Sequence, residues 1–254
     1  MSDGQALTAR VGEWIVRLAV GGAWYPQRKS PRNALPATTV RAVAQACAAA
    51  RGWKRLFDLN RVYLLATAAR QIEEDDIPGA VIEVGVHRGW SAALLRSLFP
   101  GRPLLLFDTF RGFPAEDVDL DPMLFSGVPR DILGGLFRDI DLERVKAVVG
   151  AQGDTRYHVG RFPDSASRVV LPESCCLVHL DCDLLEPTRA ALEVWFPRLA
   201  PGGFLVVHDY ANPHWRGVRM AVDSYFSSRS ERPVIWPDSG GSACLRRFAT
   251  AQPW

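Results

Sequence analysis

The pattern of hydrophobic and polar positions along the chain changes near residue 78. Up to that point, apolar residues recur at the spacing of one helix face. This periodicity predicts three helices, over residues 7–24, 38–51 and 59–74. Pro78-Gly79 then ends the helical part. We therefore expect a helical extension over residues 1–75, acting as a lid or in oligomerisation, and a second domain over residues 76–254.

Short apolar runs alternate with helical patterns from residue 80 onward. The runs are AVIEVGV, PLLLFDTF, RYHVGRF, CCLVHLD and GGFLVVHDY. Strands without polar alternation are typical of a parallel sheet that helices cover on both faces. RPVIW and ACLRRF, joined across PDSGGS, predict a C-terminal antiparallel hairpin. We expect an α/β fold with a doubly wound, mostly parallel sheet of seven strands, and only one short helix between residues 111 and 155.

The turn after the first of these strands, EVGVHRG, differs from a dinucleotide-binding turn. Its glycines, Gly85 and Gly89, stand four residues apart, and His87 stands where the dinucleotide fingerprint has its second glycine. A side chain at that position obstructs the close backbone approach that a pyrophosphate needs. A nucleoside without phosphates, such as S-adenosylmethionine (SAM), does not need this approach, so the turn favours SAM.

Two carboxylates support a nucleoside ligand at this turn. Glu83, at the end of the first strand, can orient the ammonium group of SAM. Asp108 ends the second strand, 23 residues after Gly85, close to the spacing at which an acid meets ribose hydroxyls in nucleotide-binding folds. A carboxylate can accept hydrogen bonds from both hydroxyls of a diol. The alternative is that Asp108 only caps the turn after its strand.

Acidic residues also end two later strands. Asp181 and Asp183 end one strand, and His208 and Asp209 end the next. Clustered carboxylates repel one another unless a cation or a proton lies between them. Oxygen donors favour magnesium, calcium or manganese, and an imidazole shifts the preference toward transition metals. The pattern predicts a metal site, the alternative being that Asp183 caps the next helix and His208 packs without a metal.

Together these motifs resemble the macrocin O-methyltransferase (TylF-type) family of SAM-dependent class I methyltransferases. The resemblance covers about residues 59–226 and rests on DIPGAVIEVGVHRGWSA, FDTFRGFP, VGRFPDS, LDCDLLEPTRAAL, RLAPGGFLVVHDY and AVDSYF. It implies the Rossmann-like methyltransferase fold and a SAM site built from Glu83, Gly85, Val86, His87, Gly89, Asp108, Thr109, Arg111, Gly160, Arg161, Phe162 and Asp181. It also implies a divalent ion, usually magnesium, at the residues that we expect to act in catalysis: Asp181, His208 and Asp209.

The chain departs from the family pattern at two places. The family commonly has two aspartates where this chain has His208-Asp209, which leaves the identity and the use of the metal open. Members that methylate antibiotic sugars have a catalytic histidine after the second strand, but residues 111–152 contain no histidine. His208 and His214 are the remaining histidine candidates for the base, with Asp181 or Asp183 as alternatives. Two histidines within strands are expected to be structural: His158 and His179.

Composition narrows the range of partners. The 254 residues contain 30 Lys and Arg against 28 Asp and Glu, so the basic excess typical of nucleic-acid binders is missing. The apolar stretch 15–25 is short and contains Arg17, and no signal-peptide pattern precedes it. We expect a cytoplasmic enzyme that acts on a small hydroxylated molecule, such as a sugar of a natural product. An apolar stripe predicts a homodimer through the first seventy residues: Val11, Trp14, Ile15 and Leu18.

Two other functions stay open from the sequence alone. An NAD-dependent oxidoreductase is disfavoured by His87 and by the glycine spacing of the turn. A SAM-binding protein without catalysis is favoured by the absence of a histidine in residues 111–152 and by His208 in place of an aspartate.

Overall fold

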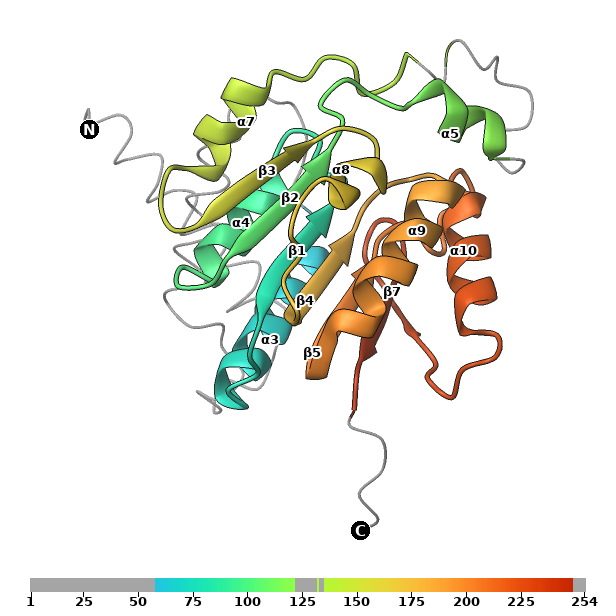
Figure 1. The fold of residues 1–254 in the computed structure, drawn as a ribbon. Coiled ribbons are helices and arrows are strands. Elements are labelled where there is room, and N and C mark those ends of the chain that lie inside the picture. The colour runs from blue at the N-terminus through green and yellow to red at the C-terminus, as the bar shows by residue number, and fades with distance from the viewer. Residues whose placement is uncertain (1–57, 122–131, 133–134, 249–254) are drawn as a thin grey trace.

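A computed structural model of the chain describes residues 58–121, 132 and 135–248. These residues form one seven-stranded sheet with the strand order β3-β2-β1-β4-β5-β7-β6. The strands are β1 (Ala80–Val84), β2 (Leu104–Asp108), β3 (Thr155–Val159), β4 (Cys175–Leu180), β5 (Leu199–Val207), β6 (Val234–Trp236) and β7 (Ser242–Arg246). The helices are α3 (Leu59–Glu74), α4 (Trp90–Leu98), α5 (Ala115–Leu120), α7 (Leu142–Val149), α8 (Asp164–Ser167), α9 (Leu185–Trp195) and α10 (Arg216–Phe226), with the 3-10 helix η2 (Phe196–Arg198) after α9 (Figure 1).

Strands β1 to β5 are parallel, and β7 runs antiparallel to both of its neighbours, β5 and β6. The predicted doubly wound, mostly parallel sheet with a C-terminal hairpin is therefore confirmed. The antiparallel strand lies inside the sheet, between β5 and the edge strand β6.

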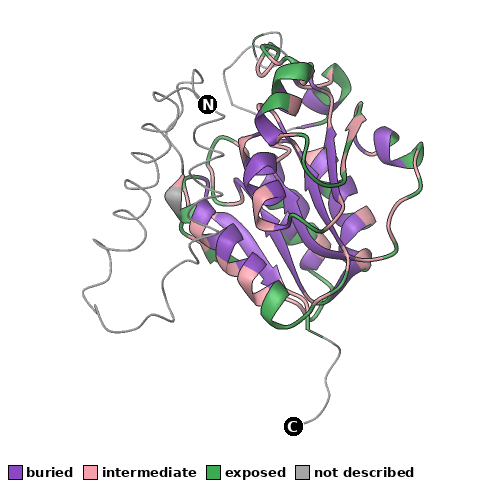
Figure 2. Ribbon diagram, turned by 90° about the vertical axis from the view of Figure 1, so that its left-hand side faces the viewer, coloured by how far each residue is buried: buried purple, intermediate pink, exposed green. Residues whose placement is uncertain are grey.

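Helices cover the sheet on both faces and enclose two cores. On one face α3, α4 and α7 pack against the sheet through residues such as Leu65, Leu95 and Val145. On the other face α9 and α10 pack through residues such as Trp195 and Val222. Figure 2 shows the buried residues gathered in the sheet and on the inward sides of these helices. The strands are thus buried on both faces, as their uninterrupted apolar runs indicate.

The stretch between residues 111 and 155 differs from the prediction. Its described part contains two helices, α5 and α7, where only one was predicted. Helix α7 has eight residues, capped by the Asp141 side chain, which accepts hydrogen bonds from the amides of Glu143 and Arg144. A helix this short has too few apolar repeats to stand out in a periodicity analysis.

Helix α3 matches its predicted bounds, and its apolar face belongs to the same core as the sheet. The helices predicted over residues 7–24 and 38–51 lie outside the described residues, as does the apolar stripe behind the predicted dimer. Among the helices that the structure describes, none is long and apolar enough to cross a membrane.

The strand order reverses between β1 and β4. From β1 the chain continues outward on one side to β2 and then β3. It then returns to β4, next to β1, and continues outward on the other side to β5. In doubly wound sheets the ligand crevice lies at this point, beyond the carboxyl ends of the strands. The fold therefore directs the turn after β1 and the acidic ends of β4 and β5 to one place.

Candidate active site

A cavity of about 450 Å³ lies beyond the carboxyl ends of β1, β2, β4 and β5. This volume is within the range of sites that bind small molecules and cofactors. Of the residues predicted to bind SAM, eight line the cavity: Gly85, Val86, His87, Asp108, Thr109, Gly160, Phe162 and Asp181. The predicted catalytic residues line it too: Asp181, His208 and Asp209.

The turn between β1 and α4 requires glycine at its first position. Gly85 has a φ of +87°, and a Cβ atom there would lie 2.0 Å from the carbonyl oxygen of Asp181. His87 has a φ of +49°, in the left-handed region that most side chains avoid. The turn therefore lies directly against the end of β4, where Asp181 begins the acidic segment. Backbone strain of this kind is often found at binding sites.

Asp108 connects this turn to the end of β2. Its Oδ2 accepts hydrogen bonds from the amides of Val86 at 2.7 Å and His87 at 2.8 Å. Its Oδ1 accepts one from the amide of Phe110 at 2.7 Å. The carboxylate thus caps its own turn, as the alternative interpretation held, and also fixes the β1–α4 turn. It lies on the cavity wall, so both interpretations fit its position.

Four residues predicted to bind SAM lie away from the cavity wall: Glu83, Gly89, Arg111 and Arg161. Gly89 caps α4, and a Cβ there would lie 2.8 Å from Val145 of α7, so this glycine allows two helices to pack closely. Arg111 is exposed. Arg161 donates hydrogen bonds at 2.9 and 2.7 Å to Asp117, which itself lines the cavity.

Glu83 is fully buried and pairs with His179 on the neighbouring strand, at 2.9 Å. The two residues are register partners between β1 and β4. Burial raises the pKa of Glu83, against the hydrogen bond from His179. The pair lies just behind the ends of the two strands that form the site, and its role in the structure is to support them. His179 is thus a structural histidine, as predicted.

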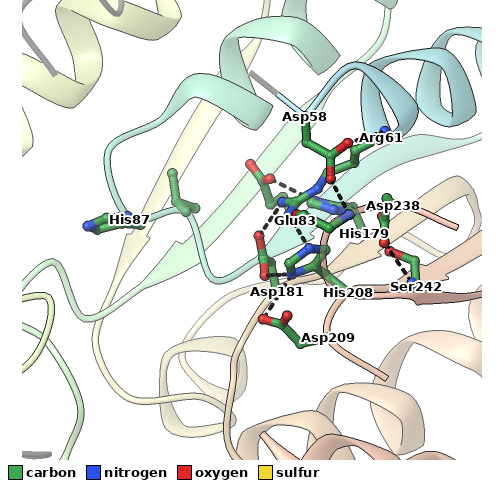
Figure 3. Close-up of polar contacts among 12 residues, drawn as sticks. Asp58, Arg61, Glu83, His87, His179, Asp181, His208, Asp209, Asp238 and Ser242 are labelled. Carbon is green, nitrogen blue, oxygen red and sulfur yellow. Dashed lines mark hydrogen bonds and ion pairs between the residues drawn. The ribbon is translucent and has the colours of Figure 1, made fainter. Parts of the chain in front are cut away.

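The acidic ends of β4 and β5 form a charged cluster with an arginine from α3 (Figure 3). His208 Nδ1 lies 2.8 Å from Asp181 Oδ1 and 3.0 Å from Asp209 Oδ2. Arg61 donates a hydrogen bond to Asp181 Oδ2 at 2.8 Å, and its other terminal nitrogen contacts His208 Nε2. In Figure 3 these four side chains converge, while His87 lies apart from them.

Electrostatic interactions within the cluster shift the pKa values of two neighbouring aspartates, Asp181 and Asp183, in opposite directions. Burial alone would raise the pKa of Asp181, but the charges of His208 and Arg61 hold it well below its usual range. Burial and the charges of Asp181 and Asp209 raise the pKa of Asp183 well above its usual range. Asp183 also lines the cavity, with a left-handed φ of +63°. The site therefore holds both an ionised carboxylate and a carboxyl group that retains its proton more readily.

The predicted metal ligands come together, since donor atoms of Asp181, His208 and Asp209 lie within 4.8 Å of one another. The surroundings of His208 do not fit a ligand. A metal-binding histidine usually donates its second ring N–H to an acceptor, but Nε2 of His208 faces Arg61, which only donates. The ring proton is then on Nδ1, the atom that faces both carboxylates.

The charge state of His208 does not alter this conclusion. Burial lowers the pKa of His208, but Asp181 and Asp209 raise it to about 10, which favours a doubly protonated ring. Contact with Arg61 favours the neutral ring instead. Nδ1 carries a proton in both states, and a protonated nitrogen has no lone pair for a metal.

Aromatic side chains form another part of the cavity wall, next to the β1–α4 turn. Phe113, Phe137 and Trp215 all line it, and the ring centroid of Phe113 lies 5.1 Å from that of Phe137 and 5.7 Å from that of Trp215. His87 contacts Phe137 edge-on, at 4.9 Å. The cavity thus has three parts in its wall: the β1–α4 turn, the charged cluster and an apolar aromatic surface suited to a ring-shaped acceptor.

Several of these residues were missed from the sequence. Arg61 carried a signal, because it shares a helix face with Leu64, Leu65 and Ile72, where an apolar residue is expected. The aromatic residues carried none, since they come from three separate segments. Two further histidines lie away from the cavity wall: His214, a candidate for the base, is exposed, and His158, which was expected to be structural, stacks on Phe107 at 4.5 Å.

Solved methyltransferases share this fold. The O-methyltransferase NovP superposes with a TM-score of 0.64 at 21% identity, over 75% of this chain and 81% of that one. The calicheamicin methyltransferase CalS11 gives 0.55 at 21% identity, over 97% and 93% of the two chains. The fold of the chain is thus that of the class I methyltransferases. The family model of the macrocin-O-methyltransferases (TylF) matches residues 51–242, more than half of the chain. The chain belongs to this family and is a SAM-dependent methyltransferase.

Two relatives are named as O-methyltransferases. One is 8-demethyl-8-(2,3-dimethoxy-alpha-L-rhamnosyl)-tetracenomycin-C 4'-O-methyltransferase of Streptomyces olivaceus, 30% identical over 76% of this chain and 78% of the relative. The other is mycinamicin III 3''-O-methyltransferase of Micromonospora griseorubida, 28% identical over 68% of each chain. The oxidoreductase and the protein without catalysis are therefore set aside.

Proposed function

We propose that the protein transfers a methyl group from SAM to a hydroxyl group on the sugar of a natural-product glycoside. The observation that carries this proposal is one continuous cavity, which joins the β1–α4 turn, the charged cluster and the aromatic wall. The name of the Streptomyces olivaceus relative, which includes a rhamnosyl group and a 4'-O-methyl transfer, supports a sugar hydroxyl as the acceptor.

SAM supplies an electrophilic methyl group, and the chain's part is to hold the donor and acceptor in line. The backbone of Gly85 to His87 and the carboxylate of Asp108 offer polar groups to the nucleoside, with Gly160 and Phe162 beside them. Arg161 acts behind this wall, because it binds Asp117, which lines the cavity. Glu83 lies behind the strand ends, paired with His179.

The acceptor hydroxyl must lose a proton when its oxygen is methylated. Asp209 is suited to accept that proton, since it lines the cavity and a hydrogen bond fixes one of its oxygens. Oδ1 accepts a hydrogen bond from Asn212 at 2.7 Å, and Oδ2 lies 3.0 Å from His208 Nδ1. His208 in turn lies between Asp209 and Asp181, with its Nδ1 2.8 Å from Asp181 Oδ1.

The divalent ion that the family resemblance implies remains a prediction, and no step proposed here passes through it. A homodimer and a cytoplasmic location likewise remain predictions.

Methyl-labelled SAM tests the proposed activity. The protein should label the sugars of rhamnosides and related deoxysugar glycosides that have free hydroxyl groups, and should not label the matching aglycones. Mass spectrometry of the isolated sugar would locate the new methyl group. Labelling of aglycone phenols alone, or of no acceptor in a broad panel of glycosides, would argue against a sugar hydroxyl as the acceptor.

Removing the Asp108 side chain should weaken the binding of SAM. We expect Asp108→Ala to lose about 1.5–3 kcal/mol of binding free energy, because a charged acceptor is lost and the β1–α4 turn is released. Calorimetry with S-adenosylhomocysteine measures this loss. Glu193→Ala, which removes an exposed acid paired with Arg189 on α9, is the control and should bind as the wild type does. Equal affinities for Asp108→Ala and the control would contradict the assignment.

A further inference from the structure

Arg61 is a buried arginine that the methyltransferase fold does not by itself require. It lies in the first turn of α3, where Asp58 accepts hydrogen bonds from the amides of Asn60 at 3.0 Å and Arg61 at 3.2 Å. This cap fixes the start of the helix, and the apolar face of α3 fixes its position against the sheet. The Arg61 residue is 6% exposed. A charge buried to this extent has to be paired.

The guanidinium of Arg61 is directed at the ends of β4 and β5 (Figure 3). One terminal nitrogen bonds Asp181 Oδ2 at 2.8 Å, and the other contacts His208 Nε2. The ring of Trp90 lies 5.6 Å below the guanidinium carbon. The cation therefore has a carboxylate, an imidazole and an aromatic face as its surroundings, all contributed by the cavity wall.

Four carboxylates act on this one cation. Those of Asp181, Asp238, Asp58 and Asp209 all favour its charged form, against the cost of burial. In a family where a divalent ion is expected at the ends of these strands, the described cluster already contains its own positive charge. Arg61 contacts His208, the residue that stands where the family commonly has an aspartate.

The contact with Arg61 also determines what His208 can do. Because Arg61 donates to Nε2, the ring proton is on Nδ1, the atom that faces Asp181 and Asp209. Nδ1 of His208 then carries the proton and has no lone pair for a metal; it lies within 3.0 Å of both carboxylates but makes no hydrogen bond to either. Arg61 and His208 together supply the positive end of the cluster that an ion would otherwise supply.

We infer that Arg61 is the permanent cation of this active site, and that methyl transfer proceeds without a divalent metal. Arg61 is a positioning residue: its two terminal nitrogens hold the carboxylate of Asp181 and the ring of His208 in place. The inference rests on the proposed function for the reaction itself, but the binding of a metal can be measured without any acceptor.

The first experiment measures metal binding by the wild-type protein. Melting temperatures are recorded in EDTA, in 1 mM Mg²⁺ and in 1 mM Mn²⁺, and each ion is titrated by calorimetry. We expect the same melting temperature in all three conditions and no saturable heat. A rise of several degrees with either ion, or turnover that EDTA abolishes and the ion restores, would overturn the inference.

The second experiment changes the cation. Arg61→Met keeps an unbranched side chain without charge and frees the proton on His208 to move to Nε2, so that Nδ1 becomes a ligand. We expect this variant to gain a melting-temperature rise of several degrees with Mn²⁺ and to lose at least 100-fold in kcat. Arg61→Lys restores a positive charge and should recover part of kcat, with no response to Mn²⁺.

A folded Arg61→Met variant that retains kcat, or that shows no response to Mn²⁺, would also overturn the inference. If Arg61→Met does not fold, the wild-type titrations and Arg61→Lys decide the question. Failure of the proposed function gives a different result: the wild-type protein would transfer no label to any glycoside, while its lack of response to metals would be unchanged.

Discussion

Gly85→Ala should destabilise the protein more than substitution of any glycine outside the site and should abolish SAM binding. A Cβ atom at Gly85 would lie 2.0 Å from the backbone oxygen of Asp181, and the φ of +87° is itself unfavourable for alanine. Neither strand end can move without breaking the pairing of β1 with β4. We expect a loss of at least about 3 kcal/mol in the free energy of unfolding, measured by urea denaturation.

Gly150→Ala is the matched control. Gly150 has almost the same φ, +88°, but no atom lies within 4 Å of its Cβ position. Its substitution should cost only the backbone strain, about 1–3 kcal/mol, and should leave the affinity for S-adenosylhomocysteine unchanged. The difference between the two variants isolates the contact with Asp181. Equal losses of stability, or normal ligand binding by Gly85→Ala, would show that the turn relaxes away from β4.

The fold was predictable because its strands carry a strong local signal. A strand buried on both faces must be mostly apolar along its length. The runs LLLFD in β2 and CCLVHL in β4 fit this rule, with one polar residue each. One of the two short helices in residues 111–155 was missed. Helix α7 shows why such a helix is hard to predict, because it packs through three valines, Val145, Val148 and Val149, against α4, which lies far away in sequence. Short helices that depend on such distant contacts have little local signal of their own.

The site was predictable only where the sheet dictates it. Parallel strands end at the same edge, so the acids that end β4 and β5 had to meet, and Asp181 and Asp209 do. Whether the Glu83 side chain faces the cavity was harder to predict, because its partner is His179, and this pairing depends on the register between β1 and β4. Arg61 was missed because it acts on Asp181 across 120 residues of sequence, from a helix that precedes the sheet.

Asp209→Asn should abolish most methyl transfer and leave SAM binding almost unchanged. The substitution keeps the shape of the side chain and removes its charge, so the oxygen that faces the cavity can no longer accept a proton from the acceptor hydroxyl. Loss of a general base typically costs 10²–10⁴-fold in rate. SAM binding should change by less than about threefold, because its predicted contacts around Asp108 are separate from this cluster.

The local structure makes this variant informative. Asp209 is buried, and a Cβ atom on Gly240 would lie 2.3 Å from its Oδ1, so the β6–β7 loop covers it closely. An isosteric amide keeps the volume under the loop, which a smaller or larger residue would change, but its NH2 group faces a donor at either His208 or Asn212, so the melting temperature of the variant is measured first. Asp223→Asn, which removes an exposed charge on α10, is the control and should keep full turnover. Single-turnover rates with labelled SAM and a glycoside acceptor separate chemistry from binding. If Asp209→Asn reacts as fast as the control, the proton passes to another group on the wall, and Asp183 would be the next carboxylate to test.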